Sequence, residues 1–497
     1  MATLKKISSQ ILVGLVVGCA LVHLTHGFTI GDYPKWKLAG WNKLPGFKAR
    51  ITQKGLDFFR DIGMETIQKH IREMHIPSQH GSAGPIYYAA TNIRIVSFGL
   101  PASIGPNIPS RDGLALHMRK GSFFLRGDLS YDFVFTTHGH FDAKLADISL
   151  DANIRIGVDS TGRPTASAES CYFHVGYVHV NLDAGMAWMF EDQVADQLKQ
   201  TLNKQVCSSV NKAINQDLEN KLRALKVTIP YKDMFKFDYS LVQSPSFNGS
   251  VDTAHKGEVY PIESKAECPI PIPGIPQDSD RTSKMLFLWV TDYLPNSAGY
   301  VLQETGHLQH NVTPENVPPE YKKYFNTSSM ALKIVIPQIS KLYPNMAMWI
   351  SLNSTKTPSV KITPNDIQAV LTADCSPYAV QPNMTKTFLF TLGVTITVDL
   401  TVGTKGNNIT WVVSSFRTTL KEGRSEVGPI KVSSLQKKVD MAIKLFILPK
   451  INRMGVAGVP LPKMDGFEMA NTSITPGLGF LKIGTDLVHT HQSANAA

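Results

Sequence analysis

The sequence lacks the short motifs that define several common enzyme classes. No G-x-S-x-G elbow, H-E-x-x-H helix, P-loop or dinucleotide-binding fingerprint occurs in its 497 residues. These absences exclude the hydrolases, zinc proteases and nucleotide-binding enzymes that such motifs identify. We therefore predict that the protein is not an enzyme. A site assembled from residues far apart in the sequence is the alternative, and product formation from labelled phospholipid would reveal it.

Cysteines and closely spaced metal ligands are also scarce. The chain has five cysteines, of which Cys19 lies in the N-terminal leader described below. No Cys or His pairs have the close spacing of a zinc site. His138 and His140 share one face of a predicted strand, but no third ligand lies nearby in the sequence. We interpret them as surface histidines and predict no metal site.

No apolar stretch is long enough to span a bilayer, which takes about 20 residues. The run from Ile11 to Val22 is preceded by Lys5 and Lys6 and followed by small or polar residues to about Gly27. This arrangement is typical of a secretory signal peptide. We therefore predict a leader over residues 1–27 and a soluble, extracellular mature protein.

The glycosylation sequons agree with secretion, and the net charge favours an anionic partner. The seven Asn-x-Ser/Thr sequons are Asn248, Asn311, Asn326, Asn353, Asn383, Asn408 and Asn471. Six of them lie in the second half, which leaves the first half freer to contact a membrane. Two of the 50 basic residues are leader lysines, so the mature chain has 48 basic against 40 acidic residues, a net charge of +8. This charge favours anionic membranes, and no feature of the chain indicates nucleic acid as a partner.

Much of the chain alternates apolar and polar residues, as strands with one buried face do. The alternating segments are Ile93–Ile95, Leu114–Met118, Leu129–Phe135, Ile148–Val158 and Phe388–Val402. Turn signals separate the first four. They predict an antiparallel meander in the first half, and the fifth predicts a further strand in the second half.

Other segments have helical spacing instead. They are Leu56–Met74, Trp188–Leu225, Pro295–Leu302 and Ser433–Asn452. Between Val194 and Leu222 an apolar residue occurs at every fourth position, so the stripe winds around the helix by about 40° per step. A twisted sheet wrapped around one long helix could follow this stripe. Two shorter helices broken near Cys207 are the alternative.

Two segments share one plan, a short strand that enters a helix, and a proline-rich run separates the two halves. The segments with the most specific sequences are Gly46–Asp57, Leu286–Gly299, Cys268–Pro276, Pro449–Asn452, Val459–Pro462 and Gly479–Val488. In content and placement they resemble the family of bactericidal/permeability-increasing protein, lipopolysaccharide-binding protein and the plasma lipid-transfer proteins.

This resemblance implies an α+β fold with the shape of an elongated boomerang. Each of two barrels would be a long twisted antiparallel sheet wrapped on helices, and a central sheet would join them. The N-terminal barrel would span residues 28–262, the Pro-rich linker 263–280 and the C-terminal barrel 281–497. The spacing of Cys171 and Cys207 resembles the family's single disulfide, which would close a loop of 36 residues and stabilise the fold by roughly 4 kcal/mol. Whether Cys268 and Cys375 pair stays open.

The resemblance also implies a bound phospholipid in each barrel and no cofactor. The family's pocket lies between the helices of a barrel and the central sheet. It would place six apolar residues near the first lipid: Ile51, Leu56, Phe59, Ile62, Ile67 and Ile71. The alternative is that these residues form only the core of the barrel.

The segment His117–Arg126 corresponds to a loop at the barrel tip that is rich in lysine in the bactericidal members of the family. In this chain the segment holds three cations and two aromatic residues: Arg119, Lys120, Arg126, Phe123 and Phe124. We predict that the cations pair with lipid phosphates while the aromatic rings enter the outer leaflet. The neighbouring hairpin Ser78–Gly84 has no lysine or arginine, so the charge is modest. An ordinary solvated basic loop is the alternative.

These observations predict a secreted, monomeric protein of innate immunity. It would bind lipopolysaccharide through lipid A on the membranes of Gram-negative bacteria and permeabilise or neutralise them. An extracellular carrier of phospholipid or neutral lipid is the alternative function.

Overall fold

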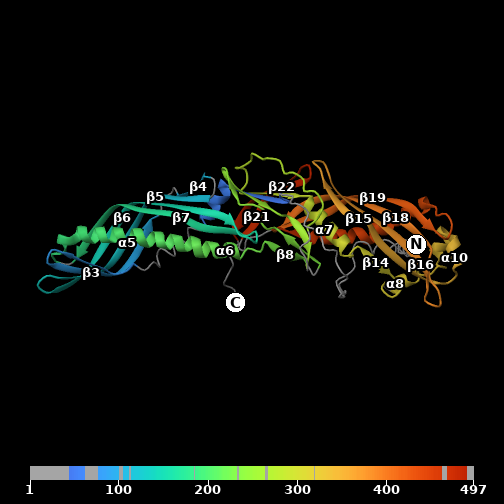
Figure 1. The fold of residues 1–497 in the computed structure, drawn as a ribbon, viewed down its shortest axis with the longest axis horizontal. Coiled ribbons are helices and arrows are strands. Elements are labelled where there is room, and N and C mark those ends of the chain that lie inside the picture. The colour runs from blue at the N-terminus through green and yellow to red at the C-terminus, as the bar shows by residue number, and fades with distance from the viewer. Residues whose placement is uncertain are drawn as a thin grey trace, which may run out of the picture.

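The computed structural model describes residues 44–61, 76–99, 104–110, 113–183, 185–231, 234–262, 267–317, 319–461 and 467–489. The molecule is elongated, with a curled sheet and helices towards each end and a further sheet between them (Figure 1). The predicted α+β architecture of two curled antiparallel sheets joined by a central sheet is confirmed.

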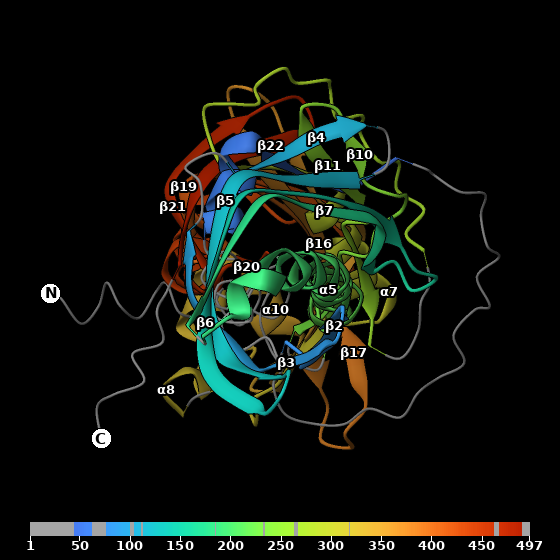
Figure 2. The same cartoon turned by 90° about the vertical axis from the view of Figure 1, so that its left-hand side faces the viewer.

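The sheet of the first half is built from very long strands. Its order is β2-β3-β5-β6-β7, with β4 paired to β5. The strands are β2 (Gln79–Ala83), β3 (Ile86–Gly99), β4 (Ile104–Ser110), β5 (Gly113–Asp132), β6 (Thr136–Val158) and β7 (Pro164–Asp183). Each of the last three has at least 20 residues and so extends over roughly 65 Å. Long strands accumulate twist, and this sheet curls around a helix (Figure 2).

That helix is nearly continuous over about 50 Å. The 3₁₀ turn η1 (Ala187–Phe190) leads into α5 (Glu191–Lys212), the π-helical segment η2 (Ala213–Leu218) and α6 (Glu219–Arg223). The predicted long helix is confirmed, and it is not broken at Cys207. A stripe of apolar residues at every fourth position drifts around an α-helix, because each α-helical turn takes only 3.6 residues. A π-helical turn takes more residues, so η2 offsets this drift. Ile214 within η2 is accordingly still buried.

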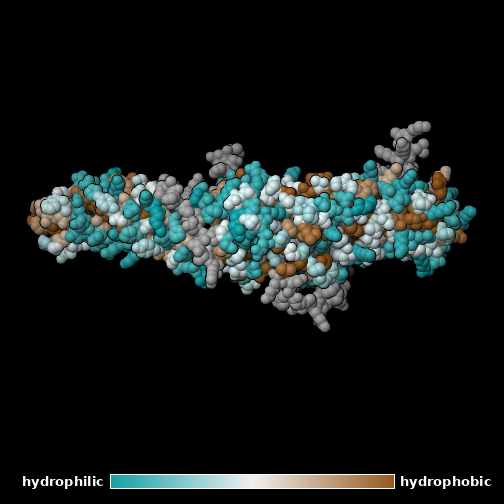
Figure 3. All heavy atoms as spheres, turned by 90° about the horizontal axis from the view of Figure 1, so that it is seen from above, coloured by the Kyte–Doolittle hydropathy of each residue, from teal (hydrophilic) through white to brown (hydrophobic). Residues whose placement is uncertain are grey.

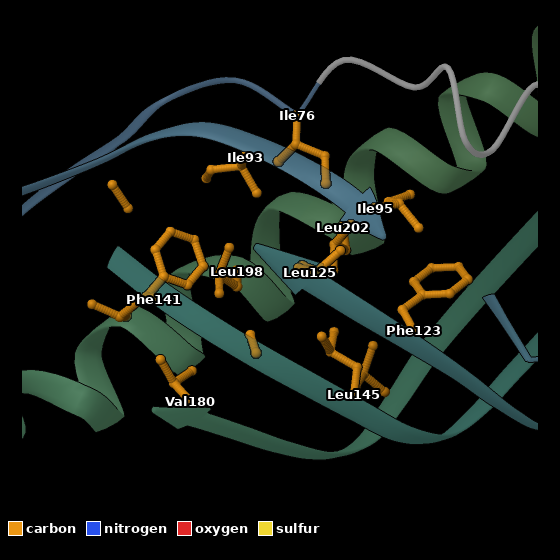
Figure 4. Packing of buried hydrophobic residues seen from close by; sticks show 14 of the residues in the cluster. Ile76, Ile93, Ile95, Phe123, Leu125, Phe141, Leu145, Val180, Leu198 and Leu202 are labelled. Carbon is orange, nitrogen blue, oxygen red and sulfur yellow. The ribbon is translucent and has the colours of Figure 1, made fainter. Parts of the chain in front are cut away.

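The long helix and the curled sheet bury a common apolar core. Leu198 and Leu202 of α5 face Leu125 of β5 and Leu145 of β6, and all four are fully buried (Figure 4). Burying each such side chain contributes about 1.5–3 kcal/mol. The alternation predicted for the strands thus turns every second residue towards the helix.

The helix is also linked to the sheet covalently. The predicted disulfide joins Cys171 of β7 to Cys207 of α5, with the two Cα atoms 5.6 Å apart. The other two described cysteines are not joined to each other. Cys268 is buried, its N–H donates a hydrogen bond to the Glu258 carboxylate, and burial raises the pKa of its thiol to about 11. Cys375 is buried on β16.

The second half repeats the plan with a different sheet. Its order is β14-β15-β16-β18-β19-β20, with β17 paired to β16. The strands are β14 (Gln309–Val312), β15 (Ala347–Ile362), β16 (Ile367–Val380), β17 (Lys386–Phe388), β18 (Phe390–Lys405), β19 (Asn408–Ser425) and β20 (Val459–Pro460). The helices are α7 (Tyr293–Glu304), α8 (Pro319–Lys322), α9 (Met330–Val335), α10 (Pro337–Leu342), α11 (Val432–Ala442), η3 (Ile443–Ile447) and α12 (Leu448–Ala457). The last three form the predicted C-terminal helical run and pack on β19.

A central sheet joins the two halves. Its order is β10-β11-β1-β13-β22-β21. These strands are β10 (Ser246–Phe247), β11 (Ser250–His255), β1 (Phe47–Thr52), β13 (Leu286–Thr291), β22 (Phe480–His489) and β21 (Phe467–Pro476). The two segments that share one plan in the sequence are direct antiparallel neighbours here, with Arg50 opposite Phe287. The final strand joins this sheet, as predicted. A small sheet, β12-β9-β8, lies beside it: β12 (Glu258–Pro261), β9 (Phe235–Asp238) and β8 (Thr228–Tyr231).

A buried arginine fastens the central sheet to the proline-rich segment. Arg50 is 2% exposed, and its Nε and Nη2 donate to the Asp252 carboxylate at 2.6 and 2.9 Å. Its Nη1 donates to the carbonyl oxygens of Asp278 and Asp280 at 2.7 and 3.0 Å. Residues 267–285 form no helix or strand. The guanidinium therefore holds an irregular segment against the sheet.

We predict that replacing both bridged cysteines, as Cys171→Ala with Cys207→Ala, lowers the free energy of unfolding by roughly 4 kcal/mol, because the unfolded chain regains the entropy of the opened loop. Denaturant titration of the variant and the wild type measures this difference. Cys268→Ala is the control, since it empties a small buried volume without opening a loop and should cost about 1 kcal/mol. Equal stability of the double variant and the wild type would contradict the prediction.

Candidate functional site

The residues predicted to line the first lipid site begin on the central sheet. Ile51 is half-buried on β1, and Leu56 and Phe59 lie in the helical residues 53–61, buried and half-buried respectively. The other three predicted lining residues, Ile62, Ile67 and Ile71, lie outside the described residues. Contact of any of the six with lipid stays a prediction.

Aromatic contacts tie the start of this helix to the far edge of the central sheet. The rings of Phe58 and Phe59 lie edge-on to Phe467 of β21, with centroids 6.1 and 5.4 Å away. Residues of the first half thereby pack directly on a strand of the second half. An apolar zone thus lies between this helix and the central sheet, where the first lipid site is predicted.

The prediction that His117–Arg126 forms a loop at the barrel tip is wrong, because this segment lies in the middle of a strand. β5 continues from Gly113 to Asp132 and pairs with β6 over this length. Register shifts between Met118 and Phe123 mark a bulge, within which Lys120 has a φ of +60°. A bulge accommodates an extra residue and a local bend without ending the strand. The turn-like sequence therefore bends β5 but does not terminate it.

The two aromatic residues of this segment face opposite sides of the sheet. Phe123 is 2% exposed, and its ring centroid lies 4.7 Å from that of Phe98 and 6.3 Å from that of Phe173. Phe124 is half-buried on the outer face. Phe123 is therefore a core residue, and the prediction that it enters a leaflet is wrong for this fold.

The three cations lie on the outer face of the sheet, and two of them already have partners. Arg126 pairs with Asp142 of β6 at 2.7 Å and Arg119 pairs with Asp151 at 2.7 Å. The hydrogen bond from Arg126 holds the pKa of Asp142 below its ordinary value. Lys120 is exposed and takes part in no ion pair of the described residues. The sheet itself thus offsets part of the positive charge.

The end of the first half is instead a hydrophobic surface. The side chains of Phe133, Val134 and Phe135, in the β5–β6 hairpin, are 51%, 75% and 78% exposed. Trp188, in the turn before α5, is 69% exposed. Together with three more exposed residues they form what we call the apolar tip: Tyr87, Phe133, Val134, Phe135, Met186, Trp188 and Met189. Apolar residues gather at this end of the molecular surface (Figure 3).

Local contacts bring the segments of the apolar tip together. Tyr87 of β3 lies opposite Asp132 at the end of β5. The Tyr131 hydroxyl accepts a hydrogen bond from the N–H of Met186 at 3.2 Å, and the Tyr131 ring lies 5.4 Å from the Phe190 ring. One tyrosine therefore connects the hairpin to the turn that carries Trp188.

No lysine or arginine occurs in the described segments that form the apolar tip. Residues 83–88, 131–137 and 185–192 contain three charged residues, Asp132, Glu191 and Asp192, all of them acidic. Arg126 lies six positions before Asp132 on β5, roughly 20 Å away along the strand. The tip can therefore gain free energy by burying aromatic surface but offers no cation to a phosphate at the same depth.

Sequence reasoning missed the apolar tip because it extended one strand through Phe135. Leu129, Tyr131, Phe133 and Phe135 alternate as strand residues should. Val134 between the last two is also apolar, which would place apolar side chains on both faces of a strand. This departure from the period of two is the signal that could have marked an exposed hairpin.

The described residues contain no cluster of three or more His, Cys, Asp or Glu side chains that could hold a metal ion. His138 and His140 are exposed, and His140 Nδ1 lies 3.0 Å from a carboxylate oxygen of Asp128. Among the residues that the structure describes, no helix has the length and apolar character needed to cross a membrane.

Comparison with known proteins matches both halves to one family. The N-terminal domain model of the LBP / BPI / CETP family matches residues 55–220, and its C-terminal domain model matches residues 231–489. Bactericidal permeability-increasing protein of Sebastes schlegelii is 30% identical over 459 residues, which cover 90% of this chain and 96% of that protein. Lipopolysaccharide-binding protein of Homo sapiens is 25% identical, covering 89% and 93%.

A solved structure has the same fold. The crystal structure of a lipopolysaccharide binding protein is similar with a TM-score of 0.61 at 22% sequence identity. The match covers 90% of this chain and 100% of that one. The likeness of fold therefore extends over nearly the whole of both chains.

We predict that the same substitution has very different consequences at two phenylalanines, one in the middle of β5 and one in the hairpin. Phe123→Ser should lower the free energy of unfolding by about 3–5 kcal/mol, because it empties a filled core position. Phe135→Ser should change it by less than about 0.5 kcal/mol, because the side chain is mostly in water. Denaturant titration distinguishes the two. A comparable loss in both variants would mean that the hairpin packs against other residues and is not an exposed tip.

Proposed function

The chain belongs to the LBP / BPI / CETP family, and from that premise we propose that it is a secreted protein that binds lipopolysaccharide through lipid A. The human relative is a lipopolysaccharide-binding protein, and the Sebastes schlegelii relative is a bactericidal permeability-increasing protein. Both align with this chain over nearly its whole length. We propose a role in innate immunity, in which binding neutralises or permeabilises Gram-negative bacteria.

The apolar tip is the observation that carries this proposal. Three consecutive apolar residues, Phe133 to Phe135, and the indole of Trp188 extend into water at one end of an elongated molecule. Aromatic and aliphatic side chains at such a place favour the boundary between headgroups and acyl chains, where apolar surface leaves water. The geometry supports insertion of the hairpin into an outer leaflet.

The cations on β5 have a separate role in this proposal. Arg119, Lys120 and Arg126 lie further along the sheet, on its outer face. With the hairpin inserted by about 5–10 Å, Arg126, roughly 20 Å behind it, would stand nearest the phosphorylated sugars above the acyl region. Arg119 and Lys120, roughly 40 Å behind it, would face saccharide further from the leaflet. Guanidinium and ammonium groups bind such phosphates. Arg126 would exchange its carboxylate partner, Asp142, for such a phosphate.

We further propose that in each half a phospholipid lies between the helices and the central sheet. Two acyl chains with some 30 methylenes expose surface worth over about 20 kcal/mol to water, so a carrier must enclose them. The plan of a curled sheet around helices, present in both halves, supports this. We propose no catalytic step, because enclosing and releasing lipid requires none, and we propose that the protein acts as a monomer.

We predict that binding to immobilised lipopolysaccharide has separable apolar and ionic parts. Phe133→Ser with Phe135→Ser should weaken binding at both low and high ionic strength, because apolar burial is not screened. Arg119→Glu, Lys120→Glu and Arg126→Glu together should weaken it about tenfold or more at low ionic strength and much less at high ionic strength. Surface plasmon resonance at the two salt concentrations measures both effects.

Arg155→Glu is the matched control for the charge reversal. Arg155 is also exposed on the outer face and pairs with Glu169, but it lies near the opposite end of β6 from the hairpin. Its reversal should leave affinity nearly unchanged. Wild-type affinity in both folded test variants would contradict the proposal. Loss in the apolar variant alone, without preference for lipopolysaccharide over phosphatidylcholine, would favour the lipid carrier instead.

A further inference from the structure

A second exposed surface lies at the opposite end of the molecule, on the short helices α9 and α10. Figure 1 places α8 and α10 at the end of the second half, away from β3 and the start of α5. Met330, Ile334 and Leu342 are 76%, 70% and 56% exposed there. Exposure of three large aliphatic side chains on two adjacent short helices is unusual for a surface that faces only water.

The exposure does not result from loose packing of these helices. Leu332 of α9, Ile339 of α10 and Ile336 between the two helices are 6%, 0% and 2% exposed and belong to the core of the second half. The chain that follows is held by the Thr327 N–H, which donates to the Met346 carbonyl oxygen at 2.9 Å. The helix pair is therefore anchored on one face and presents the other in a fixed orientation.

Lysines alternate with the exposed aliphatic residues on this face. Lys333 precedes Ile334, and Lys341 precedes Leu342, and both lysines are exposed. No ion pair of the described residues includes either of them. Residues 319–346 contain four lysines and one acidic residue, Glu320, for a net charge of +3. We call Met330, Lys333, Ile334, Lys341 and Leu342 the basic face.

We propose that the basic face is a membrane-contact site for anionic phospholipid, separate from the lipopolysaccharide site at the other end. Short amphipathic helices of this kind lie in the plane of the interface, with aliphatic side chains at the acyl boundary and lysine amines at the phosphates. An anionic bilayer interacts favourably with both kinds of residue, because it attracts each lysine and buries each aliphatic side chain. The charge of this face distinguishes it from the apolar tip, where the charged residues of segments 83–88, 131–137 and 185–192 are all acidic.

The test uses the full chain with Phe133→Ser and Phe135→Ser already in place, so that the apolar tip does not mask the second surface. Flotation with vesicles of phosphatidylcholine alone, or with phosphatidylserine added, measures binding. Lys333→Gln with Lys341→Gln should reduce phosphatidylserine-dependent binding about tenfold or more and remove most of its salt dependence. Ile334→Ser with Leu342→Ser should reduce it at every salt concentration.

Lys405→Gln with Val456→Ser is the matched control, because both residues are exposed in the same half but outside the basic face. This control should bind like its parent. Leu342→Cys, labelled with an environment-sensitive dye, should shift to shorter wavelength on anionic vesicles, while labelled Val456→Cys should not. Unchanged vesicle binding in both test variants, with circular dichroism like that of the parent, would overturn the proposal. An unchanged emission wavelength of labelled Leu342→Cys on anionic vesicles would also overturn it.

Discussion

The guanidinium of Arg50 lies where strands of the two halves meet, and the arrangement of the whole molecule depends on its contacts. It donates hydrogen bonds to the Asp252 carboxylate within the central sheet and to two carbonyl oxygens of the proline-rich segment. Removing one partner from such a buried pair typically costs about 3–5 kcal/mol, because the other charge stays buried without compensation. This contact thus ties the proline-rich segment, which leads from the first half to the second, to the central sheet.

Alternation along the strands explains why the functional surfaces lie at the ends of the molecule. Alternate residues in the middle of β5 and β6 are buried in the core that these strands share with the long helix. The outer face carries cations that are partly neutralised across the strands, as Arg126 is by Asp142. Large apolar side chains also reach water on the strands, as Tyr172, Tyr177 and Val412 do, but several gather where strands turn or helices are short. Phe135 at one end and Ile334 at the other are examples.

Features set by local periodicity could be predicted from the sequence, and those set by long-range partners could not. The four-residue stripe through Leu198 predicts one long helix, and the strand-like and helix-like settings of Cys171 and Cys207 fit their disulfide. The bulge near Lys120 could not be foreseen, because its turn-like residues occur equally in loops and only pairing with β6 keeps the strand intact. Whether Phe123 or Phe124 faces inward depends on that bulge, since a shift of one residue reverses the two faces of a strand.

Analysis of the lipid that accompanies the protein tests most directly our proposal that each half encloses the acyl chains of a lipid. Full-length protein, purified without detergent, would be extracted with organic solvent, and the extract analysed by mass spectrometry and phosphate assay. The account predicts phospholipid at up to two molecules per chain, one for each sheet-and-helix half. A folded preparation that yields no lipid and takes none up from vesicles would contradict it.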